Sequence, residues 1–138
     1  DNPCGLTVAV QRTTVSETDD VRPKKDACNG DLTVLSYDTG DNAALAVLMG
    51  RADALSADSP VTAWAVNRSE GKMRQVGDMF QASPYGFAVS KDSDLGKASA
   101  AALQHLIETG EYAEILSRWG IEDGLIDQAM INERPING

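Results

Sequence analysis

The sequence predicts an α/β fold in which a mostly parallel sheet is flanked by helices. Short runs rich in β-branched and apolar residues, at 6–10, 32–37 and 54–57, have the composition of buried strands. Segments with helical periodicity lie between them, so strands and helices alternate along the first half of the chain. This alternation is typical of parallel sheets covered by helices on both faces.

The first strand is followed by a polar turn at residues 11–14. Either Thr14 or Ser16 is expected to cap a short helix with an acidic start, because both side chains can accept a backbone hydrogen bond there. Pro23 is expected to end this helix, since proline breaks helix interiors. Residues 24–31 are then predicted to form a loop that leads into the second strand.

The next helix is predicted to begin within residues 38–42, with Ala44, Leu45, Leu48 and Met49 on one face. A third strand at 54–57 and a helix at 60–67 follow. A fourth strand is predicted at 72–76.

The character of the chain changes after Met79. A further strand is predicted at 86–90. Two apolar stripes then predict helices within 95–107 and 112–119, where Gly110 and Gly120 supply the helix-ending residues.

Composition excludes several classes of protein. The chain has 138 residues and a formal net charge of −9, and no basic cluster is longer than Lys24-Lys25, so nucleic-acid binding is not expected. No apolar run approaches the roughly 18 residues that cross a bilayer. The chain begins at Asp1 without a signal-peptide pattern, so a secreted protein would be present here as a mature or shortened form.

Motif analysis favours no enzyme, cofactor or metal. A nucleophile elbow, a P-loop, a GxGxxG and an HExxH motif are all missing, and His105 is the single histidine. Cys4 and Cys28 form no CxxC pair, which leaves zinc unsupported. From composition alone they are either two reduced thiols or one disulfide.

The geometry of a parallel sheet brings two polar segments together. Gln11, Arg12 and Thr14 follow the first strand, and Asp58 follows the third. Ligands of open α/β sheets bind at this carboxyl edge, where helix-start N–H groups suit a carboxylate and Asp58 suits an ammonium. These are the two ends of an α-amino acid. The alternative is that Asp58 is an ordinary N-cap ahead of Ser59-Pro60.

Six segments resemble the bacterial extracellular solute-binding proteins of family 3, the amino-acid receptors of ABC importers. They are VAVQRTT at 8–14, GRADA at 50–54, ADSP at 57–60, PYGFAV at 84–89, GEY at 110–112 and RWG at 118–120. The last third of the chain, with Ile131-Asn132, is similar to the actinobacterial branch, which tends to carry a cysteine before the first of these strands. The resemblance covers about residues 4–132.

The resemblance implies roles for six residues. Asp58 is expected to bind the α-ammonium of an amino acid, and Thr14, Val15 and Ser16 are expected to meet its carboxylate, partly through backbone N–H groups. Gln11 and Arg12 are expected to face the ligand side chain. The family usually has Gly-Thr-Thr where this chain has Thr13-Thr14-Val15, so backbone donation at Val15 is expected rather than a side-chain contact.

The family resemblance also implies a domain organisation of the periplasmic binding protein type II kind. Residues 1–83 correspond to the second lobe of such a receptor, and residues 84–138 to a strand and helices that return to the first lobe. The first half of a receptor is missing, so half of the ligand site is expected, with weak binding of a polar or charged amino acid. The strand at 86–89 would lack its usual partner, and we expect it to pair antiparallel within the chain or to be exchanged in a homodimer.

The resemblance places the protein outside the cytoplasm, periplasmic or secreted or lipid-anchored, with an ABC permease as the partner of the full-length protein. An oxidising location favours a Cys4–Cys28 disulfide. Two other functions remain open, a cyclohexadienyl-dehydratase-like enzyme of the same fold and a ligand-sensing receptor module.

Overall fold

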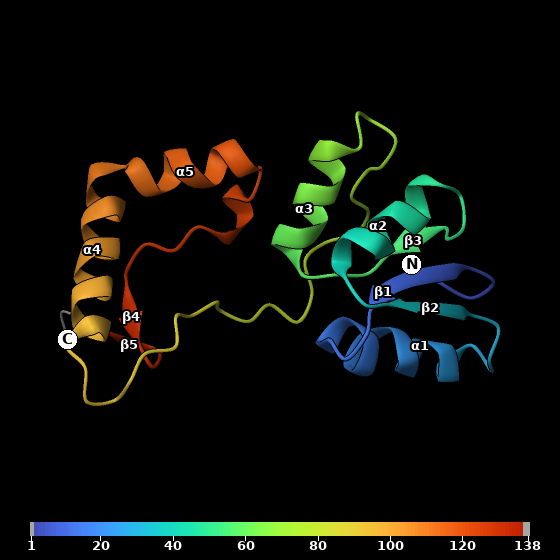
Figure 1. Ribbon diagram of the computed structural model, residues 1–138, viewed down its shortest axis with the longest axis horizontal. Coiled ribbons are helices and arrows are strands. Elements are labelled where there is room, and N and C mark those ends of the chain that lie inside the picture. The colour runs from blue at the N-terminus through green and yellow to red at the C-terminus, as the bar shows by residue number, and fades with distance from the viewer. Residues whose placement is uncertain (1, 137–138) are drawn as a thin grey trace. The chain divides into compact units, whose positions relative to one another are not determined.

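A computed structural model describes residues 2–136 (Figure 1). The chain divides into two compact units, unit 1 with residues 1–78 and unit 2 with residues 79–138. Unit 1 is built on a three-stranded parallel sheet of order β2-β1-β3. The central strand β1 (Thr7–Gln11) lies between β2 (Thr33–Tyr37) and β3 (Ala54–Leu55). The predicted α/β class with a parallel sheet is confirmed.

The alternating side chains of β1 divide the core of unit 1 into two layers. Val8 and Val10 pack on one face of the sheet, against Val21, Cys28 and Leu32. The other face consists of small residues, where Ala9 packs with Ala43, Ala46 and Ala52. Helices therefore cover both faces of the sheet, as the alternation of strands and helices predicted (Figure 1).

Helix α2 (Gly40–Leu48) lies on the alanine face of the sheet. The face predicted to carry Leu45, Leu48 and Met49 is not the one that packs on the sheet: these three residues are exposed, and Ala43 and Ala46 are buried. The helix presents its smallest residues to the sheet, and this lets the two backbones approach closely. Helix α3 (Ser59–Arg68) packs beside α2 and agrees with the predicted helix at 60–67.

The first helical segment is longer than the sequence predicted. A π-helical turn, η1 (Ser16–Val21), continues into α1 (Arg22–Ala27), so Pro23 does not end the helix and much of the predicted loop at 24–31 is helical. Pro23 lies at the second residue of α1, where π-helical geometry changes to α-helical geometry, and the helix continues through it. The turn that follows uses Asn29 and Gly30, both with positive φ.

A disulfide joins Cys4 to Cys28, with a Cα–Cα distance of 5.4 Å. It links the segment before β1 to the residue that follows α1, at the amino end of the sheet. The predicted disulfide is therefore present in the structure.

Two predicted strands do not form. Residues 72–76 and 86–90 lack regular secondary structure and pair with no strand among residues 2–136. An apolar run becomes a strand only where another strand accepts its backbone groups, and the sheet of unit 1 does not receive these segments. The prediction that 86–89 pairs within the chain is wrong, and the strand-exchanged homodimer has no support.

Unit 2 contains a helical hairpin, α4 (Leu95–Thr109) and α5 (Glu111–Trp119). Gly110 joins the two helices in the left-handed conformation, with φ of 82°, as its place in the sequence predicted. A 3-10 turn, η2 (Glu122–Gly124), leads to a short antiparallel pair of β4 (Met130–Ile131) and β5 (Arg134–Pro135). The Ala129 N–H donates to Gln104 Oε1 at 3.0 Å and ties this pair to α4.

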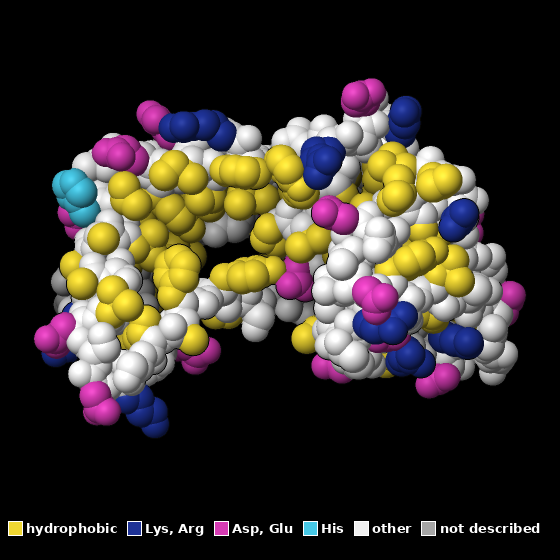
Figure 2. All heavy atoms as spheres, in the orientation of Figure 1, with side chains coloured by type: hydrophobic (Ala, Val, Ile, Leu, Met, Phe, Trp, Pro, Cys, Tyr) yellow, Lys and Arg dark blue, Asp and Glu magenta, His cyan; other side chains and the backbone are white. Residues whose placement is uncertain are grey.

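Apolar side chains appear on the surface of both units, with acidic and basic side chains scattered among them (Figure 2). His105, the single histidine, is exposed on α4. Within the described range, no helix has the length and apolar character needed to cross a bilayer.

Candidate functional site

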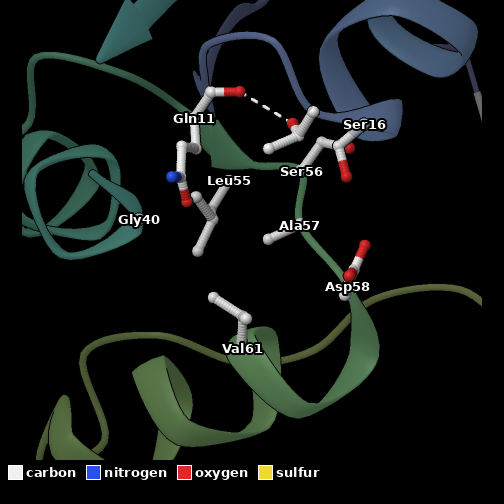
Figure 3. A pocket seen from close by; sticks show the side chains of 9 residues that line it. Gln11, Ser16, Gly40, Leu55, Ser56, Ala57, Asp58 and Val61 are labelled. Atoms are coloured by element: carbon white, nitrogen blue, oxygen red, sulfur yellow. Dashed lines mark hydrogen bonds between the residues drawn. The ribbon is translucent and has the colours of Figure 1, made fainter. Parts of the chain in front are cut away.

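A small hollow lies at the carboxyl edge of the sheet in unit 1, with a volume of about 50 Å³ (Figure 3). It is bounded by the ends of β1 and β3 and by the starts of η1, α2 and α3. The lining residues are Gln11, Thr14, Ser16, Gly40, Leu55, Ser56, Ala57, Asp58 and Val61. Four of the six predicted ligand residues therefore surround one hollow.

Gln11 ends β1 and forms one wall of the hollow beside Gly40 (Figure 3). A Cβ added to Gly40 would lie 3.4 Å from Gln11 Oε1 and 3.5 Å from Val61 Cγ1. These are ordinary contact distances, so Gly40 lies next to both the Gln11 amide and the first turn of α3. The amide brings both a hydrogen-bond donor and an acceptor to this wall.

The turn after β1 has an unusual backbone. Thr13 has φ of 61°, a left-handed conformation that β-branched residues rarely adopt. The Thr14 hydroxyl donates to the Gln11 carbonyl at 2.7 Å, the contact drawn in Figure 3. This hydroxyl closes the turn, so the predicted capping by Thr14 or Ser16 is wrong, and Val15 occupies the N-cap position of η1.

Glu17 lies behind this turn and is 4% exposed. Its carboxylate accepts hydrogen bonds from the Ser36 hydroxyl at 2.5 Å, the Thr13 N–H at 2.6 Å and Arg22 at 2.7 Å. These bonds, led by the one from Ser36, lower the pKa of Glu17 from 4.5 to about 2. The carboxylate is therefore charged throughout the physiological range.

Asp58 occupies the N-cap position of α3, where its carbonyl accepts the first helical hydrogen bond from the Thr62 N–H at 2.9 Å. Its carboxylate makes no capping bond to the described backbone of α3. Figure 3 shows this carboxylate at the rim of the hollow, on the side of Ser16. The capping position and the site position of Asp58 thus coincide in one residue.

Two predicted site residues lie outside the lining. Arg12 forms an ion pair with Asp38 at 3.0 Å, and a long contact at 3.5 Å joins it to the Ser36 carbonyl. The Val15 side chain is 61% exposed and does not line the hollow.

Sequence analysis missed several lining residues and the buried carboxylate behind them. Ser56 and Ala57 were assigned to the third strand, which ends at Leu55, so they belong to the loop that borders the hollow. Their position directly before Asp58 was the available signal. The local sequence of Glu17 predicts only an acidic helix start, and nothing in it marks the residue as buried.

The arrangement is suited to noncovalent binding. The hollow is lined by one carboxylate, one amide and several hydroxyl or backbone groups, together with the apolar side chains of Leu55 and Val61. Among residues 2–136, no three His, Cys, Asp or Glu side chains form a group that could hold a metal ion.

Comparison with known proteins finds a relative that aligns with nearly the whole chain. The arginine-binding protein ArgT of Corynebacterium glutamicum is 60% identical to the chain over 141 aligned positions, which cover 99% of the chain and 46% of the relative. The chain thus spans about half the length of the curated protein it matches. No family model matches the chain, and neither does any solved structure.

Proposed function

We propose that the chain is part of the substrate-binding component of an amino-acid ABC importer. This proposal is supported by its homology, along almost its whole length, to a family 3 solute-binding protein. Residues 1–78 contribute one side of the ligand site, formed by the residues that line the hollow at the carboxyl edge of the sheet.

The grouping of Gln11, Thr14, Ser16 and Asp58 around one hollow carries this proposal. The Asp58 carboxylate at the rim suits the α-ammonium of an amino acid, because a charge-assisted hydrogen bond is stronger than a neutral one. The N–H groups at the start of η1, including that of Val15, suit the carboxylate end. The two ends of an amino acid thus have complementary groups on the same wall.

The ligand we propose is a polar or charged amino acid, with L-arginine first because the relative is named an arginine-binding protein. Arg12 is engaged by Asp38, so its positive charge is offset at the place where a cationic side chain would approach. Gln11 then offers an amide oxygen to that side chain. A hollow of about 50 Å³ covers only part of an amino acid, so we expect weak binding by this chain alone.

The setting we propose is extracytoplasmic, with an ABC permease as the partner of the full-length protein. The Cys4–Cys28 disulfide supports an oxidising location. Residues 1–83 are proposed to correspond to the second lobe and residues 84–138 to the part that returns to the first. The dehydratase alternative is not favoured, because the homologue is named a binding protein and not an enzyme.

Titration of the chain with L-arginine, followed through backbone amide signals in NMR spectra, tests the proposal. We expect shifts confined to residues around the hollow, and about tenfold weaker binding or more in the variant Asp58→Asn, because a hydrogen bond to a charged group is lost. Asp123→Asn removes an equivalent exposed charge from unit 2 and serves as the matched control. Equal affinities of the two variants would show that Asp58 does not bind the ammonium.

A further inference from the structure

Two buried carboxylates project from the π-helical turn η1 toward the carboxyl end of the sheet. Glu17 is 4% exposed and Asp20 is 8% exposed, whereas Asp19 between them is exposed. Charged side chains are buried at this level only where they are paired and hydrogen-bonded. Neither carboxylate lines the hollow.

Their hydrogen bonds reach all three strands of the sheet. Glu17 accepts from the Thr13 N–H, two residues after the end of β1, and from the Ser36 hydroxyl in β2. Asp20 accepts from the Ser56 hydroxyl, directly after β3, at 3.0 Å. One helix face is therefore hydrogen-bonded to β2 and to the segments that follow β1 and β3, and it is the ends of β1 and β3 that border the hollow.

Each carboxylate also meets a cation on its outer side. Arg22 lies 2.7 Å from Glu17, and Lys24 lies 2.5 Å from Asp20. These ion pairs offset the two negative charges beside the sheet. The electrostatic potential in the hollow is therefore less negative than it would be next to two unpaired carboxylates.

The backbone conformation of Thr13 indicates why its hydrogen bond to Glu17 matters. Its left-handed backbone, with φ of 61°, is disfavoured for a β-branched residue by a factor of about five or more. Such a conformation persists only where surrounding contacts hold it. The Thr13 N–H donates to Glu17 at 2.6 Å, and the Thr13 hydroxyl donates to the Arg12 carbonyl at 2.6 Å, so Glu17 supplies the one of these two bonds that comes from outside the turn. The neighbouring residues Gln11 and Thr14 line the hollow.

We propose that Glu17 and Asp20 are positioning residues for the hollow, with Glu17 holding Thr13 in its left-handed conformation and Asp20 holding the loop at Ser56. The positioning of ligand groups rests on the proposed function. The holding of the two loops does not, and it can be measured in the free chain.

The decisive measurement is amide hydrogen exchange by NMR in the unliganded chain. Glu17→Met keeps the approximate size of the side chain but removes both acceptors, and we expect the Thr13 amide to exchange about tenfold faster while the amides of Val8 to Val10 keep their protection. Glu17→Gln retains one acceptor oxygen and should restore part of the protection. Asp19→Asn is the matched control on the same helix and should leave Thr13 unchanged.

A second cycle separates positioning from a general structural role. Glycine adopts the left-handed conformation without strain, so Thr13→Gly should reduce the effect of Glu17→Met on L-arginine affinity from about fivefold to nearly none. If Glu17→Met alone unfolds β1, the double variant with Thr13→Gly should fold and supplies the measurement. Asp20→Leu should weaken L-arginine binding by a similar factor without altering exchange at Thr13.

The same Thr13 exchange rate in Glu17→Met as in Asp19→Asn would overturn the role of Glu17. Full L-arginine affinity in Asp20→Leu would overturn that of Asp20. An unmodified chain that shows no shifts with L-arginine would contradict the proposed ligand, and the exchange data would still decide whether Glu17 holds the turn.

Discussion

Reduction of the Cys4–Cys28 disulfide should destabilise unit 1 strongly. The bond closes a loop with a sequence separation of 24 residues, and the chain-entropy relation gives about 3.5 kcal/mol for a loop of that size. A folded unit of residues 1–78 is expected to have about 4 to 12 kcal/mol of stability in total. The cross-link therefore supplies a large share of what keeps this unit folded.

Urea unfolding with and without a thiol reductant measures the effect, with the amide signals of Val8, Ala9 and Val10 as reporters of unit 1. With a slope of about 1 kcal/mol per molar urea, the midpoint should fall by about 3.5 M on reduction. Signals from α4, in unit 2, should be unaffected because the disulfide lies entirely in unit 1.

The double variant Cys4→Ala/Cys28→Ala is the control for packing. Cys28 belongs to the core layer around Val10, so the variant loses sulfur contacts that reduced wild-type protein retains. It should therefore be somewhat less stable than the reduced protein and insensitive to reductant. Coinciding midpoints for oxidised and reduced wild-type protein would refute the reasoning, and two alkylated thiols in unreduced protein would refute the pairing itself.

Three further outcomes are expected. Because the pKa of Glu17 is lowered from 4.5 to about 2, the contribution of its carboxylate to the free energy of unfolding should be complete above pH about 4.5 and lost as the pH falls toward 2. Carbon NMR of the Glu17 carboxyl group measures this titration, and a midpoint near pH 4.5 would contradict the hydrogen bonds described. Thr39→Ala removes the oxygen that accepts the Asn42 N–H at 3.2 Å at the start of α2, so unfolding free energy should fall by about 1 kcal/mol, with Thr39→Ser close to wild type. Val10→Ala opens space at a fully buried position and should cost about 2 kcal/mol in the same urea assay, whereas Val76→Ala, at an exposed valine, should cost little.

The parts of the fold that sequence analysis predicted correctly depend on local pattern. The strand at Thr7–Gln11 and the helix at Ser59–Arg68 have composition and end signals that agree with their final environment. Gly110 ends α4 because only a residue that tolerates φ of 82° fits there. In each case neighbouring residues alone were sufficient.

The errors occur where tertiary contacts decide. Residues 86–90 have strand composition but form no strand, because strand formation depends on a partner and not on composition alone. The sequence predicts a helix end at Pro23, but the helix continues through this residue where π-helical geometry changes to α-helical geometry. The left-handed Thr13 was not predictable, since a threonine gives no local indication of positive φ.

In the candidate site, too, the sequence predicts some residues correctly and misses those that depend on tertiary contacts. Asp58, Gln11 and Thr14 were identified because strand order in a parallel sheet fixes which loops meet at its carboxyl edge. Arg12 was included for the same reason, but its pairing with Asp38 depends on the course of a loop that sequence analysis could not fix. The anchoring carboxylates of η1 required knowledge of which helix face is buried.

The alanine layer between α2 and the sheet has a consequence for how this domain can vary. Ala9 and Ala43 have no exposed surface, so an added methylene has no space and would push the helix away from the strands. Because the first residue of α2, Gly40, borders the hollow, such a displacement would reach the site as well. Random mutagenesis should therefore find this layer nearly invariant, while Leu45, Leu48 and Met49 on the outward side of the same helix accept many replacements.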